Sequence, residues 1–209
     1  MSKGVLVVVS GFSGSGKGTI MRRLLEKYDN YGLSISATTR QPREGETHGK
    51  EYFFQTTEEF ENMIRQGQLI EYAQYVGNYY GTPKAYVEEQ RNLGKDVILE
   101  IEIQGAMKIK EQYPDTVLLF VTPPSAEELK RRLVGRGTET EDVIESRLVR
   151  AVQESEGMDL YDYLVINDDL ETCVDEVHAI IQSEHDKASR NEEFIERIRK
   201  QLKVFVKGE

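Results

Sequence analysis

Residues 5–19 read VLVVVSGFSGSGKGT, and this stretch decides the fold. Its first five residues are apolar and mostly β-branched, which predicts a strand buried on both faces, as in parallel sheets. Glycines follow between Gly11 and Gly18, and Ile20, Leu24 and Leu25 then have the spacing of one face of an amphipathic helix. A buried strand, a glycine turn and a helix in this order predict the first unit of a parallel α/β sheet.

The glycine turn also predicts an anion site. Its backbone can curl so that successive N–H groups point at one anion, because glycine adopts conformations that other residues avoid. The helix N-terminus contributes its positive dipole end, and Lys17 adds a full positive charge. Spacing, lysine and context together indicate a loop that binds nucleotide phosphates, rather than an ordinary glycine turn.

The residue after the lysine departs from the common form of this loop. Ser or Thr usually stands there and binds Mg²⁺ through its hydroxyl, whereas here Gly18 comes first and Thr19 second. One residue is a rotation of about 100° around a helix, so we do not expect Thr19 to substitute. We expect phosphate oxygens and water to hold Mg²⁺, with an acid nearby. Glu100 and Glu102 are the candidates, because a strand over 96–102 would place both on one side; a solvated strand end is the alternative.

The rest of the chain alternates strands with helices. Further strands are predicted over 96–102, 116–121 and 163–166, and helices over 105–112, from Ser125 with Glu128 as its capping box, and over 170–184. This alternation predicts a parallel sheet flanked by helices. Residues 33–82 differ, because short alternating segments surround one helix near 57–66, which predicts a small mixed-β insertion.

Composition limits the class of protein. The chain has 209 residues, 38% of them hydrophobic and 31% charged, which is typical of a soluble globular domain. No apolar run approaches the about 20 residues of a membrane span, and no targeting pattern is evident, so we expect a cytoplasmic protein. A net charge of −10 argues against nucleic-acid binding. The single cysteine, Cys173, is predicted to be a core side chain in a reducing compartment.

Two groups of arginines could bind further anionic oxygens. Arg40 and Arg43 flank a proline that stiffens a turn, and guanidinium forks suit phosphate oxygens; two solvated loop arginines are the alternative. Arg132 and Arg136 lie four residues apart on one helix, near glycines that would allow a hinge, and Arg147 follows. Closure of such a segment over a transferring phosphoryl group is one interpretation, and helix-surface charge paired with nearby acids is the other.

Six segments in order resemble the guanylate kinase family, and the resemblance extends over residues 4–184. These segments are GFSGSGKGT (11–19), SATTRQPREGETHGKEYFF (36–54), LIEYAQYVGNYYGTP (69–83), ILEIEIQGA (98–106), PPSAEELKRRLVGRGTETEDVIESRL (123–148) and LVINDDL (164–170). The resemblance implies the reaction ATP + GMP ⇌ ADP + GDP, a step of purine nucleotide recycling, with Mg²⁺ as cofactor and ATP as co-substrate. It implies a P-loop core over about 1–32, 84–134 and 150–209, a GMP-binding insertion over about 33–83 and a lid over about 135–149.

The resemblance also implies roles for residues on the ATP side. Asn167 would lie near the adenine, and Glu102, which stands where the family usually has Asp, would lie beside the metal and its waters. Arg132, Arg136 and Arg147 would surround the transferring phosphates. The loop residues that would hold the ATP phosphates, with Lys17 at the transferred group, are Gly11, Phe12, Ser13, Gly14, Ser15, Gly16, Lys17, Gly18 and Thr19.

On the GMP side, the resemblance implies one set of residues for the phosphate and one for the base. The phosphate of GMP would be bound by Arg40, Arg43, Tyr52 and Tyr80, and the guanine by Ser36, Glu71, Thr82 and Glu100. A carboxylate such as Glu71 suits guanine, because guanine offers N1–H and N2–H₂ as adjacent donors and adenine does not.

Two other functions remain open at this point. Adenylate kinase-like chains share the Gly-Lys-Gly-Thr pattern, although the TTRQPR and NYYGTP segments argue against them. A protein-binding module with a kinase-like fold would be expected to lack an intact phosphate loop. We expect GMP and ATP as small-molecule partners, no nucleic acid and no membrane, and a monomer or a homodimer. The apolar stripe of Phe194, Ile198 and Leu202 predicts a C-terminal helix that packs on the core or forms a dimer contact.

Overall fold

The computed structural model describes residues 3–75, 77–135 and 140–206. Its larger sheet is entirely parallel. Across this sheet the strands run in the order β2 (Tyr31–Leu33), β7 (Asp96–Glu100), β1 (Leu6–Gly11), β8 (Val117–Thr122) and β9 (Tyr163–Ile166). The sequence-based prediction of a parallel α/β core is therefore confirmed.

Strand β1 is central to the sheet and is buried on both faces. Val5, Val7 and Val9 point to one face, where they pack with α1 (Lys17–Lys27) and α7 (Leu170–His185). Leu6 and Val8 point to the other face. The helices that supply buried residues to that second cluster are α3 (Lys84–Asn92), α4 (Ile103–Gln112), α5 (Ala126–Gly135) and α6 (Glu141–Ser155). The apolar run of β1 thus reflects burial on both sides.

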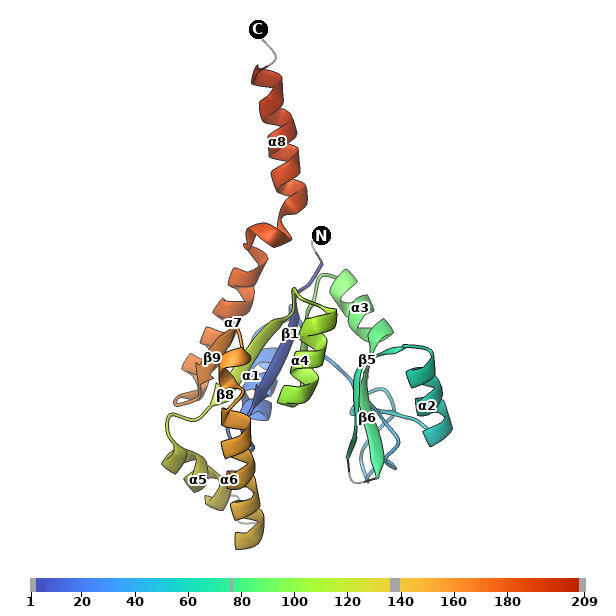
Figure 1. Ribbon diagram of the computed structural model, residues 1–209, viewed down its shortest axis with the longest axis vertical. Helices are drawn as coiled ribbons and strands as arrows, with labels where there is room; N and C mark the ends of the chain where they lie inside the picture. Colours follow the sequence, from blue (N-terminus) through green and yellow to red (C-terminus); the bar gives the residue numbers. More distant parts are fainter. Residues whose placement is uncertain (1–2, 76, 136–139, 207–209) are drawn as a thin grey trace.

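A second, mixed sheet lies to one side of this core, as Figure 1 shows. Its strands run in the order β4 (Phe53–Phe54), β3 (Ala37–Thr38), β6 (Asn78–Pro83) and β5 (Leu69–Tyr75). Helix α2 (Thr57–Arg65) packs on it, and the ring of Phe60, fully buried, stacks on Tyr79 with centroids 5.2 Å apart. A capping box of Thr56 and Glu59 begins this helix.

The end of one predicted strand differs from the sequence-based expectation, and one predicted helix cap is confirmed in part. Strand β7 ends at Glu100, not at residue 102, because its pairing with β1 ends at the Val9–Glu100 register and the chain then enters α4 with Glu102 at the N-cap. Ser125 Oγ accepts from the backbone N–H of Glu128 at 3.1 Å, as predicted, while the Glu128 carboxylate is occupied by Arg131 and Arg132.

The C-terminal segment departs most from the expectation. Short 3₁₀ turns η1 (Met158–Leu160) and η2 (Ala188–Arg190) precede β9 and α8 (Glu192–Val206), and α8 extends away from both sheets (Figure 1). Phe194 and Leu202 are more than half exposed, so the prediction that this helix packs on the core is wrong. Cys173 is buried in α7, as predicted, and burial raises the pKa of its thiol to about 12. None of the described helices is both long and apolar enough to span a membrane.

Candidate active site

A cavity of about 610 Å³ opens at the carboxyl ends of β1 and β7, between the glycine loop and α6. Ligands bind at this end of the strands in open α/β sheets. The cavity brings together six of the predicted residues, which are Gly11, Ser13, Lys17, Glu100, Glu102 and Arg147. It is also lined by residues for which the sequence had predicted no role, including Ser10, Asp142, Ser146 and Glu154.

The loop between β1 and α1 needs its glycines for steric reasons. Gly14 and Gly16 have φ of 90° and 95°, in the left-handed region that favours glycine. A Cβ on Gly16 would lie 2.3 Å from Asn167 Nδ2, so a side chain there would displace Asn167. At Gly18, in contrast, a Cβ would meet nothing within 4 Å. The space beside Gly18 would therefore accept the usual Ser or Thr, and the departure at this position has no steric cause.

Side chains from two distant segments hold the same loop through the carbonyl oxygen of Ser15. The carbonyl oxygen of Ser15 accepts from Asn167 Nδ2 at 2.7 Å and from Arg132 Nη1 at 3.3 Å. Arg132 also donates to the Asn167 carbonyl at 2.8 Å, and Glu128 orients it through a bond to Nε at 2.6 Å. Glu128 is a supporting residue that sequence reasoning placed only in a helix cap.

Lys17 begins α1 and lies over the loop. Its Nζ donates to the carbonyls of Gly11 at 2.7 Å and Phe12 at 3.1 Å. Arg147 reaches the loop from α6, where its Nη1 donates to Ser13 Oγ. Arg136, the other predicted lid arginine, lies outside the described residues. Two cationic side chains from different helices thus converge on one loop of backbone N–H donors, an arrangement that suits a polyphosphate.

The two candidate metal-binding acids are exposed, so the alternative of a solvated strand end is the one that the structure shows. Glu100 ends β7 at the surface, and the side chain of Glu102 is 70% exposed. Glu102 pairs with Arg150 at 2.6 Å, and Arg150 also bonds to Glu154 at 3.1 Å. Both carboxylates therefore stay hydrated, because the strand ends before Glu102 and the chain then enters α4.

The donor set of the cavity fits Mg²⁺. Carboxylate and hydroxyl oxygens are available from Glu100, Glu102 and Ser13, and hard oxygen donors are what Mg²⁺ prefers. The described residues contain no group of three or more His, Cys, Asp or Glu side chains that could hold a metal by themselves. Any Mg²⁺ at this site therefore needs oxygens from a bound phosphate chain and from water.

A second polar group lies on the mixed sheet, where β5 meets the start of α4. Thr82 is fully buried and its Oγ1 donates to Glu71 Oε1 at 2.8 Å. Burial raises the pKa of the Glu71 carboxyl, and the bond from Thr82 offsets this in part. The other oxygen of Glu71 faces Gly105 of α4, where a Cβ would lie 3.8 Å from it. A half-buried acid in this position can accept bonds from a ligand with adjacent N–H donors.

Two predicted tyrosines of this insertion, Tyr52 and Tyr80, lie near Arg40. Its guanidinium lies 5.2 Å from the Tyr52 ring centroid, and the rings of Tyr52 and Tyr80 are 6.2 Å apart. Arg40 Nη2 donates to Glu46 Oε1 at 2.9 Å. The side chain of Arg43 is exposed, and Ser36 is half-buried with its carbonyl bonded to the Phe53 N–H at 2.9 Å.

Glu46 is a residue of this group that sequence reasoning missed. Its second oxygen accepts from the backbone N–H of Arg43 at 2.7 Å, so one carboxylate joins both arginine positions. These two bonds hold the pKa of Glu46 below its usual range, and the bond from Arg40 has the larger effect. The REGE run offered the signal, since an acid three residues after Arg43 in a Pro- and Gly-containing turn can return to the turn's backbone.

A parallel sheet with a glycine–lysine loop at the end of β1, joined to a small mixed sheet that carries a second cationic group, defines a P-loop nucleotide kinase. The sequence profile of guanylate kinases matches residues 3–184. The guanylate kinase of Oceanobacillus iheyensis is 52% identical over 204 residues, 98% of this chain and 96% of that one. The guanylate kinase of Lactococcus lactis is 53% identical over 188 residues, 90% of this chain and 92% of that one.

A solved structure agrees with these relatives. The crystal structure of guanylate kinase from Anaplasma phagocytophilum superposes with a TM-score of 0.71 at 36% identity, and covers 91% of this chain and 90% of its own. The chain belongs to the guanylate kinase family.

Asn167→Ala removes the 2.7 Å bond to the Ser15 carbonyl. We expect faster hydrogen exchange in residues 13–17 of the free protein and roughly fivefold weaker ATP binding, since one hydrogen bond is worth about 1 kcal/mol. Hydrogen exchange by mass spectrometry and calorimetry measure the two effects. Asn62→Ala, in α2, is the matched control. Unchanged exchange in the loop would show that Asn167 does not support it.

Proposed function

We propose that this chain catalyses ATP + GMP ⇌ ADP + GDP with Mg²⁺, with ATP bound at the glycine loop and GMP at the mixed sheet. The observation that carries the proposal is the 610 Å³ cavity at the loop of a guanylate kinase family member, because it joins Lys17, Arg147 and both acids. Family membership supports the reaction, and the geometry supports where it takes place.

The reaction needs charge neutralisation more than it needs a base. A phosphate oxygen of GMP attacks the γ-phosphorus of ATP, the bond from that phosphorus to the β–γ bridging oxygen breaks, and ADP leaves with the electron pair. The attacking phosphate is already an anion, so no side chain has to remove a proton. Positioning and electrostatic stabilisation carry the rate, and this is the role we assign to the N–H groups of Gly11–Thr19 and to four cationic side chains, Lys17, Arg132, Arg136 and Arg147.

Lys17 would move from the loop to the substrate. Its ammonium now bonds to the carbonyls of Gly11 and Phe12, which a phosphate oxygen would replace as acceptor. A charge-assisted bond to phosphate is stronger than a bond to a neutral carbonyl, so ATP supplies the driving force for this exchange. Arg147, whose Nη1 now donates to Ser13 Oγ, would similarly turn to the β- and γ-phosphates.

Mg²⁺ would neutralise charge on the phosphate oxygens of bound ATP. The residue that would hold it through water is Glu102. Glu102 has first to exchange its bond with Arg150, an exposed pair whose loss costs little.

The mixed sheet would bind GMP through two separate features. Arg40, Arg43, Tyr52 and Tyr80 would bind the phosphate, and Glu71, Thr82, Ser36 and Glu100 would read the base. The half-buried carboxylate of Glu71 supports a preference for guanine, because N1–H and N2–H₂ can donate to it whereas adenine would leave its second oxygen without a donor.

Three bodies follow from this assignment. The core comprises about 1–32, 84–134 and 150–209, the GMP-binding insertion about 33–83, and the lid about 135–149. Closure of the insertion and the lid would exclude water and bring the two phosphates together. Nucleotides are the only partners this reaction requires, and a cytoplasmic monomer or homodimer with no nucleic-acid or membrane partner suits its small-molecule substrates.

Lys17→Ala should lower kcat at least about 100-fold, because it removes a full charge at the transferred phosphoryl group. A coupled assay of ADP release measures this. Lys27→Ala is the matched control, since Lys27 ends the same helix and pairs with Asp175 away from the loop. The assignment of Lys17 fails if both variants keep the wild-type rate.

Glu71→Gln should weaken GMP binding by about tenfold or more and leave ATP binding unchanged, because a charged acceptor becomes a neutral amide. The raised pKa of Glu71 adds a pH dependence with a defined sign. As pH falls toward that raised value, above the ordinary value of about 4.3, Glu71 gains a proton and GMP affinity falls. Calorimetry from pH 7 down to 5 measures it.

The variant also serves as the reference in this titration. GMP itself gains a proton in the same pH range, and this affects its binding to the wild-type chain and to Glu71→Gln alike. The difference between the two pH profiles of GMP affinity is therefore the contribution of Glu71. Parallel profiles, or equal losses for GMP and ATP, would mean that Glu71 has a structural role.

A further inference from the structure

Arg150 lines the cavity of the proposed reaction but has no part in the transfer described above. It lies in α6, three residues after Arg147, so the two side chains are neighbours on one face of the helix. Both line the 610 Å³ cavity together with Lys17. A cationic side chain in a cavity that suits a polyphosphate is a candidate for a direct part in the chemistry.

Two acids hold the guanidinium of Arg150 in the free chain. Its Nη2 lies 2.6 Å from Glu102 Oε2, and its Nε donates to Glu154 Oε1 at 3.1 Å. Glu154 lies one turn further along α6, whereas Glu102 comes from another element, at the N-cap of α4. The side chain of Glu102 is 70% exposed and that of Glu154 is 19% exposed. The contact with Glu102 is therefore the one that can be exchanged, because water screens an exposed ion pair.

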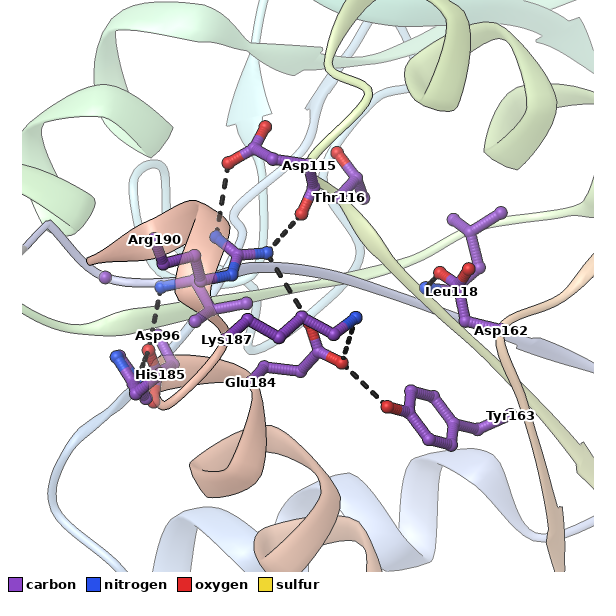
Figure 2. Close-up of polar contacts among 12 residues, drawn as sticks. Asp96, Asp115, Thr116, Leu118, Asp162, Tyr163, Glu184, His185, Lys187 and Arg190 are labelled. Carbon is purple, nitrogen blue, oxygen red and sulfur yellow. Dashed lines mark hydrogen bonds and ion pairs between the residues drawn. The ribbon is translucent and has the colours of Figure 1, made fainter. Parts of the chain in front are cut away.

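Figure 2 shows an arginine in the opposite kind of surroundings, at the base of α8. Arg190 Nη1 lies 3.2 Å from Asp115 Oδ2, and its Nη2 lies 3.7 Å from Oε2 of Glu184, which is buried and also contacts Lys187 at 2.7 Å. An arginine that neutralises a buried acid has to stay in place, because its loss leaves a buried charge short of a partner. Neither acid of Arg150 is buried in this way, so its guanidinium can move at little cost.

The pair of Arg150 and Glu102 lies between the two nucleotide sites of the proposed reaction. Arg147, one turn earlier in α6, reaches the glycine loop. Glu102 is the N-cap of α4, and Gly105 in the first turn of that helix faces Glu71 of the mixed sheet. A position between the loop and Glu71 is where a γ-phosphoryl group would pass from ATP to GMP.

The charges around the cavity show why one more cation matters. Among the described residues that line it, three side chains are cationic and four are acidic. The cations are Lys17, Arg147 and Arg150, and the acids are Glu100, Glu102, Asp142 and Glu154. A polyphosphate adds several negative charges to this set, so its transfer needs every cation that can turn toward it.

Binding of ATP with Mg²⁺ removes the attraction that keeps Arg150 on Glu102. The carboxylate of Glu102 would pass to the water shell of the metal, since Mg²⁺ carries twice the charge of a guanidinium. Arg150, still held through Nε by Glu154, then has its Nη groups beside phosphate oxygens. A guanidinium fork matches the oxygens of a phosphoryl group, and a hydrogen bond between ions is stronger than one between neutral groups.

We propose that Arg150 is a further catalytic residue, which neutralises Glu102 in the free chain and turns to the γ-phosphoryl group when ATP and Mg²⁺ bind. The inference rests on the proposed function, because it takes ATP as the ligand of the glycine loop. One exchange supplies both a carboxylate for the water shell of the metal and a guanidinium for the charge on the transferring oxygens. Until the exchange, Arg150 reduces the repulsion between Glu102 and the incoming phosphate chain.

Arg150→Gln separates the γ-phosphoryl group from the rest of the nucleotide. The variant should bind ATP with Mg²⁺ about tenfold more weakly and ADP with Mg²⁺ within about twofold of the wild-type chain, because ADP has no γ-phosphoryl group. Calorimetry without GMP measures both affinities. In the coupled assay with GMP, kcat should fall at least about tenfold, since the charge-assisted bond is also lost in the transition state.

Arg23→Gln is the matched control. Arg23 is similarly exposed and also bonds to two acids, Glu171 at 2.6 Å and Glu26 at 3.4 Å, but it does not line the cavity. This variant should keep the wild-type kcat and both nucleotide affinities. Circular dichroism verifies that both variants are folded.

The exchange itself is tested with ATP in the absence of metal. In the wild-type chain Glu102 then keeps Arg150, so Glu102→Gln should raise the affinity for metal-free ATP by about fivefold, because it releases the guanidinium. The same substitution in the Arg150→Gln background should change that affinity by no more than about twofold. Calorimetry in the presence of EDTA measures all four chains.

Three results would overturn the inference. The first is a wild-type kcat for Arg150→Gln in a chain that turns over GMP. The second is an equal loss of ATP and ADP affinity in that variant, which would place Arg150 away from the γ-phosphoryl group. The third is an equal effect of Glu102→Gln in both backgrounds, which would reduce the pair to simple charge repulsion. A wild-type chain without GMP turnover would instead refute the proposed function, and the same assay records this before any variant is tested.

Discussion

The burial of β1 on both faces is the constraint on which the rest of the structure depends. Helices must cover both sides of a strand whose side chains are apolar throughout, and this requires parallel neighbours joined by crossover helices. Parallel strands end at one edge. The loop after Gly11, Glu100 at the end of β7 and Asn167 after β9 therefore meet there, although they are far apart in the sequence.

The loop at this edge owes its shape to contacts with side chains from two distant segments. Gly16 leaves room for Asn167, and Asn167 and Arg132 hold the Ser15 carbonyl, so the path of the loop backbone is fixed before a ligand binds. The mixed sheet uses the same principle, since Glu46 holds Arg40 and the backbone of Arg43. In the proposed reaction both anion sites are preorganised, which is the largest source of rate in phosphoryl transfer.

Local patterns predicted β1, the loop and α1 because each depends on neighbouring residues alone. The position of Glu102 could not be predicted in this way: the alternation of residues 96–102 does not reveal that pairing with β1 ends at Glu100. Glu46 was missed because its partners depend on the path of a loop. The stripe of α8 was found, but whether it packs on the core depends on the ion pairs at its base, which no periodicity reveals.

The central claim is that the glycine loop and the half-buried Glu71 serve one phosphoryl transfer from ATP to GMP. The most direct measurement is ADP release with ATP and Mg²⁺, with GMP, AMP, UMP, CMP and dTMP tested separately. The account predicts turnover with GMP and none above background with AMP or the pyrimidine monophosphates. Comparable turnover with AMP would contradict the assignment of Glu71, and no turnover by the folded chain with any of them would contradict the assignment of the loop.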